Sequence, residues 1–139
     1  MIQRVTHAFI LVTDQDLALD FYVGKLGFTV KTDMVLEQYN GMRWLSVSPP
    51  GQPDFELVLD KVRPYQGPEN ERQMTELLAA GSMPTVIFQV DDCRASHDEL
   101  VAKGVDFYDP PTEHFYGIDA GFRDPFGNPF RMTQPHAAV

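Results

Sequence analysis

One arrangement of residues occurs twice in this chain. Residues 7–14 alternate apolar side chains with others and end in an aspartate, and a stretch with helical spacing then reaches Gly27. Residues 85–92 repeat this arrangement, and their helical stretch reaches Gly104. Copies of one supersecondary unit usually bury their apolar faces by packing against one another. The repeat therefore predicts a chain built from two copies of a single unit.

Each copy is predicted to have the order β-α-β-β-β, which makes the fold class α+β with two tandem modules. Module one covers about residues 4–60, and module two covers about residues 84–134. Asp14 can cap the first helix, because its side chain can accept a backbone N–H of the first turn. The strands expected after the helices lie near residues 30–37, 41–48 and 55–60 in module one, and near 105–108, 116–123 and 129–134 in module two.

Residues 61–83 have no counterpart in module two and are expected to connect the modules. Within them, residues 69–80 suggest a short helix that Gly81 ends. Because long connections often carry function, a lid over a pocket is the alternative to a simple connector. Residues 124–128, Asp-Pro-Phe-Gly-Asn, predict a tight turn whose Asp and Asn side chains bond the local backbone.

The size and charge of the chain restrict its partners. A chain of 139 residues suits one domain, residues 1–139, with room for a core and a pocket. Its net charge of −9 disfavours nucleic acid and anionic membranes and is better suited to a cationic or neutral small molecule. The single cysteine, Cys93, excludes an internal disulfide and a multi-cysteine zinc site. The first residues lack the features of a signal peptide, and no segment has the apolar length of a membrane span, so we expect a cytoplasmic protein.

Several short motifs together resemble the vicinal oxygen chelate superfamily, which includes glyoxalases, bleomycin-resistance proteins and extradiol dioxygenases. The motifs are His7-x-x-x-x-Val12-x-Asp14, Leu26-Gly27-Phe28, Phe88-x-Val90-Asp91-Asp92, Lys103-Gly104-Val105 and residues 122–128. The resemblance extends from residue 7 to about residue 134. It implies curved mixed sheets around a central cavity, and it implies a homodimer. The two modules could pair within one chain or exchange with a second chain, and both arrangements stay open.

The resemblance also implies where a glyoxalase-like metal site would lie. Carried onto this chain, the four ligand positions are His7, Glu56, Thr85 and Arg131. Only the first two are metal ligands, and the guanidinium of Arg131 is a permanent cation that would repel a metal ion. We therefore expect a pocket without a metal or other cofactor, in which Glu56 and Arg131 pair beside His7. The alternative is a divalent metal held by His7, Glu56 and possibly His114.

The expected function is a metal-independent small-molecule-binding protein that sequesters its ligand, as the resemblance to bleomycin-resistance proteins implies. An enzyme of the glyoxalase-like branch, a lyase or isomerase with Glu56 as candidate catalytic base, is the second hypothesis. A structural module without a ligand is the third. Aromatic walls and a few convergent polar groups are typical of ligand pockets. The expected ligand-binding residues are His7, Phe9, Trp44, Glu56, Gln89, His114, Tyr116 and Arg131.

Overall fold

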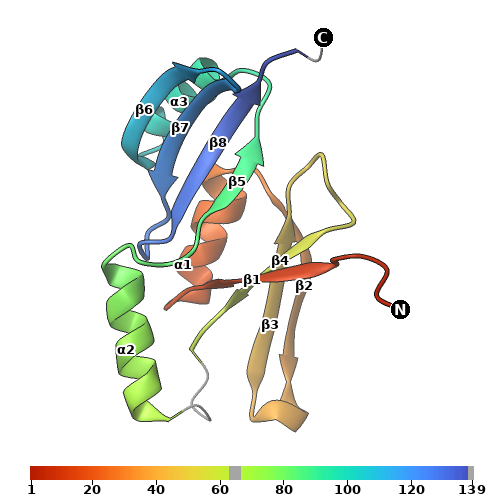
Figure 1. Cartoon of the computed structure of the whole chain (residues 1–139). Helices are drawn as coiled ribbons and strands as arrows, with labels where there is room; N and C mark the ends of the chain where they lie inside the picture. Colours follow the sequence, from red (N-terminus) through yellow and green to blue (C-terminus); the bar gives the residue numbers. More distant parts are fainter. Residues whose placement is uncertain (63–66, 138–139) are drawn as a thin grey trace. The chain divides into compact units, whose positions relative to one another are not determined.

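The computed structural model describes residues 1–62 and 67–137 and divides into two compact units, Met1–Thr75 and Glu76–Val139. Each unit contains one four-stranded mixed sheet with a helix on one of its faces (Figure 1). The predicted α+β class with two β-α-β-β-β modules is thereby confirmed. Residues 63–66 of the expected connector lie outside the described residues.

The first unit follows the predicted order of elements. Its sheet has the strand order β1-β4-β3-β2, in which β1 is parallel to β4 and the other neighbours are antiparallel. The elements are β1 (His7–Leu11), α1 (Gln15–Leu19), the π-helical turn η1 (Asp20–Lys25), β2 (Thr29–Leu36), the 3₁₀ turn η2 (Glu37–Tyr39), β3 (Met42–Ser48) and β4 (Glu56–Asp60).

Local signals fix the first helix. The Asp14 carboxylate accepts the backbone N–H of Leu17 at 2.9 Å, as its role as N-cap predicts. Gly27, with φ of +77°, allows the left-handed conformation that ends the helix. The helix buries Ala18 and Phe21, together with the apolar side chains of one face of the sheet.

Arg43 shows which face of the sheet α1 covers. Its guanidinium bonds Asp33 of β2 at 2.8 Å and Asp16 of α1 at 2.7 Å. Successive side chains of a strand point to opposite faces, so Trp44 and Ser46 lie on the face away from α1. His7 and Phe9 share that second face, as predicted, because their cross-strand partners are Glu56 and Val58, and Val58 also pairs with Ser46.

The second unit has the strand order β5-β8-β7-β6, with β5 parallel to β8. The helix α2 (Pro68–Ala79), which corresponds to the helix predicted within the connector, spans the division between the units. The remaining elements are β5 (Val86–Gln89), α3 (Cys93–Ala102), β6 (Asp106–His114), β7 (Gly117–Arg123) and β8 (Pro129–Pro135).

One strand of the second unit is longer than predicted. The sequence indicates a strand near residues 105–108, whereas β6 extends to His114 through Pro110 and Pro111. An edge strand tolerates proline because its outer side needs no ladder hydrogen bond, and β6 is such an edge. Two irregularities in its pairing with β7, between Phe107 and Asp109 and between Asp109 and Thr112, also accommodate the prolines.

The core of the second unit lies between its sheet and α3. The Asp92 carboxylate caps this helix by accepting the N–H of Ala95 at 3.0 Å. Under the helix, the ring of Phe88 lies 5.4 Å from that of Phe130 and 6.4 Å from that of Phe122. The other face of the sheet is therefore the one on which polar side chains can gather.

The turn between β7 and β8 forms as predicted. One oxygen of Asp124 accepts the backbone N–H groups of Phe126, Gly127 and Asn128, at 3.0, 3.0 and 2.8 Å. The other oxygen accepts the Asn128 amide at 2.6 Å. The motif thus specifies a local backbone structure and supports the fold rather than the chemistry.

Candidate functional site

The face of the first sheet that lies away from α1 carries four of the predicted site residues, and Ser46 lies among them. We call them the His7 cluster: His7, Phe9, Trp44, Ser46 and Glu56. His7 and Glu56 are direct cross-strand partners on β1 and β4. Trp44 and Ser46 come from β3, where alternation places both on the same face. The register of three neighbouring strands therefore brings the cluster together.

Hydrogen bonds fix the polar centre of the His7 cluster. The buried hydroxyl of Ser46 donates to Glu56 Oε1 at 2.6 Å, and Glu56 Oε2 lies 3.1 Å from His7 Nε2. An ionised carboxylate only accepts, so Nε2 carries the proton of this contact. The Nδ1 atom of a neutral His7 then accepts the Thr6 hydroxyl at 2.8 Å. Both predicted polar residues are held in one defined orientation.

Aromatic rings flank this polar centre. The Trp44 ring meets the His7 ring edge-on at 6.2 Å between centroids and meets the Phe9 ring at 5.7 Å. The Phe9 side chain is 53% exposed although it belongs to a sheet. An exposed apolar side chain beside fixed polar groups is a feature of binding surfaces.

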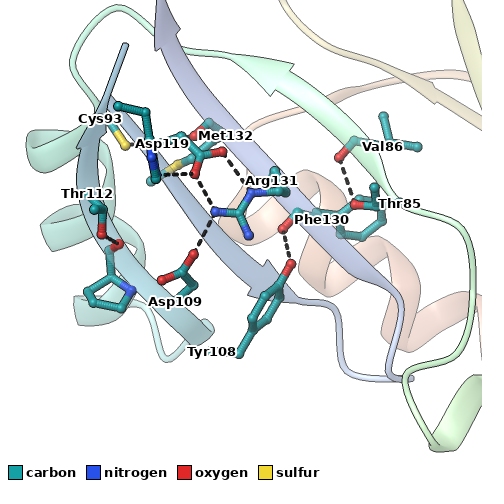
Figure 2. A network of polar contacts seen from close by, with 12 residues as sticks. Thr85, Val86, Cys93, Tyr108, Asp109, Thr112, Asp119, Phe130, Arg131 and Met132 are labelled. Carbon is teal, nitrogen blue, oxygen red and sulfur yellow. Dashed lines mark hydrogen bonds and ion pairs between the residues drawn. The ribbon is translucent and has the colours of Figure 1, made fainter. Parts of the chain in front are cut away.

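The second sheet carries a separate polar network on its face away from α3. We call it the Arg131 cluster: Tyr108, Asp109, His114, Asp119 and Arg131. Arg131 donates from Nε to Asp119 Oδ2 at 2.8 Å and from Nη2 to Asp109 Oδ2 at 2.7 Å (Figure 2). Nη2 also donates to Asp119 Oδ1, so the Asp119 contact is bidentate. Strands β6, β7 and β8 each contribute to this network.

Charge and burial differ between the two aspartates. The Asp119 side chain is only 3% exposed, and its hydrogen bond from Arg131 holds the pKa of Asp119 below its ordinary value, against the opposing effect of burial. The same contact raises the pKa of Arg131. Asp109 is 40% exposed and presents its carboxylate to solvent. The formal charges of Arg131, Asp109 and Asp119 sum to −1.

The sequence analysis selected Arg131 but missed Asp109 and Asp119. Asp119 alternates with Gly121 along β7, and an aspartate at that position of a central strand is a sign of a buried ion pair. The predicted partner of Arg131 was Glu56, whereas the guanidinium is bound within its own unit by the two aspartates. A Glu56–Arg131 pair would join the two units and stays a prediction.

Tyr108 holds Arg131 in place from the side. Its hydroxyl donates to the Phe130 carbonyl at 3.2 Å, and its ring centroid lies 5.9 Å from the Arg131 guanidinium and 4.7 Å from that of Arg123. The ring rests on Gly121, where an added Cβ would come within 2.5 Å of it. Glycine at this position leaves the space that Tyr108 occupies.

The remaining predicted site residues of the second unit lie around this network. The His114 ring stacks on Tyr116 at 5.1 Å, and its Nε2 atom lies 3.7 Å from Asp119 Oδ1. Gln89 belongs to the same face, because its partner Thr133 follows Arg131 at the spacing of two. The structure therefore places His114, Gln89 and Arg131 on one face of one sheet, with Tyr116 stacked on His114 from the turn between β6 and β7. His7, Phe9, Trp44 and Glu56 share a face of the other sheet.

Two of the four metal-ligand positions, Thr85 and Arg131, carry side chains that do not suit a metal ion. The Thr85 hydroxyl donates to the Pro129 carbonyl at 2.9 Å, and Arg131 contributes a cation. Within residues 1–62 and 67–137, no group of three or more His, Cys, Asp or Glu side chains is arranged to hold a metal.

The described residues also include no helix long and apolar enough to cross a membrane.

Comparison with known proteins finds similarity along almost the whole chain. Residues 4–132 match the Glyoxalase/Bleomycin resistance protein/Dioxygenase superfamily. YurT of Bacillus subtilis (strain 168) is 35% identical over 132 residues, which cover 94% of this chain and 98% of YurT. The crystal structure of UcmS2 is 37% identical with a TM-score of 0.89, covering 96% of this chain and 99% of UcmS2. That of TnmS3, an antibiotic binding protein from Streptomyces sp. CB03234, is 34% identical with a TM-score of 0.75, covering 96% and 97%.

Proposed function

Because the chain belongs to the Glyoxalase/Bleomycin resistance protein/Dioxygenase superfamily, we propose that it binds and sequesters an aromatic small molecule without a metal ion. The observation that carries this proposal is the position of Arg131 and its hydrogen bonding to two aspartates. At a position where metal-dependent relatives have a ligand, this chain has a guanidinium bound by Asp119 and Asp109. Such a network is a preformed polar surface. It is a poor metal-binding site, because the guanidinium is a permanent cation.

The similarity to TnmS3 supports the same proposal, since that protein is an antibiotic binding protein. The aromatic side chains add to this support, because Phe9 and Tyr116 are 53% and 41% exposed beside fixed polar groups. The binding residues proposed are His7, Phe9, Trp44, Glu56, Gln89, His114, Tyr116 and Arg131.

We further propose a homodimer located in the cytoplasm. Support for assembly comes from the superfamily to which the chain belongs, since the resemblance to it implies a homodimer. Sedimentation velocity at two protein concentrations tests the dimer, and a single monomeric species at both would contradict it.

Intrinsic fluorescence gives a direct test of binding. Trp44 is the only tryptophan of the chain and belongs to the His7 cluster, so a ligand there should change its emission. We expect saturable quenching by at least one member of a panel of aromatic antibiotics, with matching heats in titration calorimetry and no change on adding EDTA. Absence of binding throughout the panel, or binding only with added metal, would contradict the proposal.

A lyase or isomerase with Glu56 as base is a second candidate function. Two contacts of Glu56, with Ser46 and with His7, favour this function. They hold the carboxylate in one orientation and leave it partly exposed. Glu56→Gln should then abolish turnover of a small oxygenated substrate, whereas Glu99→Gln on the exposed side of α3 should not. Substrate consumption that is equal in both variants would eliminate this candidate.

A further inference from the structure

We propose that the Thr6 hydroxyl is a nucleophile, activated by His7 and Glu56, that hydrolyses aryl esters through an acyl-threonine intermediate. We call these three residues the Thr6 triad. All of them belong to the unit Met1–Thr75, so the reaction uses no residue of the second unit. The proposal goes beyond ligand sequestration, because it gives the first unit a chemical step of its own.

Hydrogen bonds join a hydroxyl, an imidazole and a carboxylate in the order that nucleophilic catalysis requires. Thr6 Oγ1 lies 2.8 Å from His7 Nδ1, and His7 Nε2 lies 3.1 Å from Glu56 Oε2. Because an ionised carboxylate only accepts, Nε2 carries the imidazole proton, and Nδ1 of the neutral ring accepts from the Thr6 hydroxyl. A hydroxyl within reach of a base that a third group orients is typical of an activated nucleophile.

The carboxylate of the Thr6 triad is itself held by a buried donor. Ser46 is completely buried, and its hydroxyl donates to Glu56 Oε1 at 2.6 Å. This bond leaves Oε2 facing His7, where it fixes the tautomer and the orientation of the imidazole. Ser46 is therefore a positioning residue that acts through Glu56.

The segment that carries the hydroxyl is fixed by two backbone contacts. The N–H of Glu56 donates to the Thr6 carbonyl at 3.0 Å, and Arg4 Nη2 donates to the Asp54 carbonyl at 2.9 Å. These contacts hold the residues before β1 beside the residues before β4. Thr6 is exposed, so a substrate carbonyl can reach Oγ1 from solvent.

Aromatic side chains beside the Thr6 triad favour an aryl group in the substrate. The Trp44 ring lies 6.2 Å from the His7 ring and 5.7 Å from the Phe9 ring. Phe9 is 53% exposed, which leaves its ring free to pack against a flat group. An aryl ester also releases a phenolate, which is a good leaving group and needs little assistance from the protein.

The first step transfers the acyl group to the protein. Thr6 Oγ1 forms a bond to the ester carbonyl carbon while its proton passes to His7 Nδ1. The bond from that carbon to the aryl oxygen breaks, and the phenolate leaves with the electron pair. The proton on His7 passes to the phenolate or to solvent, and Glu56 stabilises the imidazolium while it exists.

The second step consumes water and restores the protein. His7 takes a proton from a water molecule, whose oxygen forms a bond to the acyl carbon. The bond to Thr6 Oγ1 breaks, and this oxygen leaves with the electron pair and recovers a proton from His7. One ester and one water molecule thus give one carboxylic acid and one phenol, without an oxidant or a reductant.

Hydrolysis of p-nitrophenyl acetate, followed by the absorbance of the released p-nitrophenolate, tests the Thr6 triad. Thr6→Ala, His7→Gln and Glu56→Gln should each lower kcat/KM at least about tenfold, because each removes one group of the triad. Thr6→Ser keeps the hydroxyl and should keep most of the activity. Thr75→Ala is the matched control, since this exposed threonine donates to the Glu71 carbonyl at 2.7 Å, and it should leave the rate unchanged.

A covalent label distinguishes the Thr6 nucleophile from His7 acting directly on water. Phenylmethanesulfonyl fluoride carries an aryl group and transfers its sulfonyl group irreversibly to activated hydroxyls, with release of fluoride. It should stop the hydrolysis, and mass spectrometry of the peptides should place one label on Thr6. Circular dichroism and urea unfolding establish that each variant is folded before its rate is compared.

The results that would overturn the proposal are distinct from those that test sequestration. Equal rates for the natural protein and Thr6→Ala, or a label on a residue other than Thr6, would eliminate the nucleophile. Loss of activity in EDTA with recovery on adding zinc would show that His7 and Glu56 act through a metal ion instead. Binding in the antibiotic panel is measured without any ester, so the proposed function is tested independently of the Thr6 triad.

Discussion

At the scale of single residues, the pair of Asp119 and Arg131 illustrates how burial changes the effect of an ion pair on stability. The Asp119 side chain is 3% exposed and receives two hydrogen bonds from the guanidinium. Removing one partner of a buried pair leaves the other charge uncompensated. The resulting loss in the free energy of unfolding is larger than the net stability that the intact pair contributes. This pair therefore has a much larger effect on stability than exposed ion pairs such as Arg4 with Asp54.

Asp119→Asn should lower the free energy of unfolding by about 3 kcal/mol at pH 7, because Arg131 loses its bidentate partner in a site with little solvent. Urea unfolding followed by circular dichroism measures the change. Asp98→Asn, at an exposed position of α3, should change the same quantity by less than about 0.5 kcal/mol. Equal effects of the two substitutions would show that the buried pair has no special role.

The same pair predicts a pH dependence. The folded-state pKa of Asp119 is below its ordinary value of 3.8, so its contribution to stability is present above about pH 4 and is lost as the pH falls further toward the folded pKa. The difference in unfolding free energy between the natural protein and Asp119→Asn should therefore shrink from pH 7 to pH 3. A difference that stays constant across this range would contradict the assignment.

Cys93 offers a second test at this scale. Its thiol is buried at the start of α3, and burial raises its pKa, so little thiolate is available to react. In the native state at pH 8, Ellman's reagent should react far more slowly than with the protein unfolded in urea, where one thiol per chain is expected. Rapid reaction in the native state would contradict the burial of Cys93.

At the scale of elements, the turn between β7 and β8 connects two parts of the second unit. Gly127 has φ of +114° and lies against the Leu78 carbonyl at the end of α2. Both the backbone conformation and the close approach require a residue without a side chain. The turn motif thus positions a helix as well as reversing the chain.

Gly127→Ala should destabilise the protein by about 2 kcal/mol or more, because the new Cβ would collide with the Leu78 carbonyl oxygen and would also strain the backbone. Thermal unfolding by calorimetry measures the effect. Gly24→Ala is the control, since this helical glycine has no atom within 4 Å of the added Cβ, and we expect no loss of stability there. Equal destabilisation by both substitutions would contradict the contact with α2.

At the scale of the whole molecule, two units of similar design present different chemistry on corresponding faces. The first carries a histidine and a glutamate in contact, and the second carries an arginine between two aspartates. This difference is the basis of the proposal that the chain binds its ligand without a metal. Both faces carry carboxylates, in keeping with the net charge of −9.

Metal removal provides the prediction at this scale. Dialysis against EDTA should leave the melting temperature and the ligand affinity unchanged, because residues 1–62 and 67–137 include no group of three or more His, Cys, Asp or Glu side chains arranged to hold a metal. Differential scanning calorimetry and ligand titration before and after dialysis measure both. A fall in melting temperature of about 4 °C, which corresponds to about 1 kcal/mol at this size, would contradict a metal-free protein. Recovery of the melting temperature on adding zinc would show that the protein binds a metal.

The sequence by itself determined the repeated β-α-β-β-β module, its helix caps and the turn at residues 124–128. Asp14 and Asp92 accept backbone N–H groups only three residues ahead, and Asp124 bonds its own turn. Such contacts depend on neighbours in the chain, so their residue types and spacing are sufficient to predict them. The sharing of one face by His7, Phe9 and Trp44 was also predictable, because it follows from alternation along strands.

Only the tertiary structure decided the partners of Arg131 and the length of β6. Asp109 lies on β6, whose two prolines kept this part of the chain from being predicted as a strand. An irregular register brings Asp109 opposite Gly121 and near Arg131. Burial of Asp119 depends in the same way on the sheet around it. Alternation predicts the face of a strand on which a side chain lies, but the register between strands selects its partner. Register is fixed by the packing of the whole sheet, which no local stretch of sequence specifies.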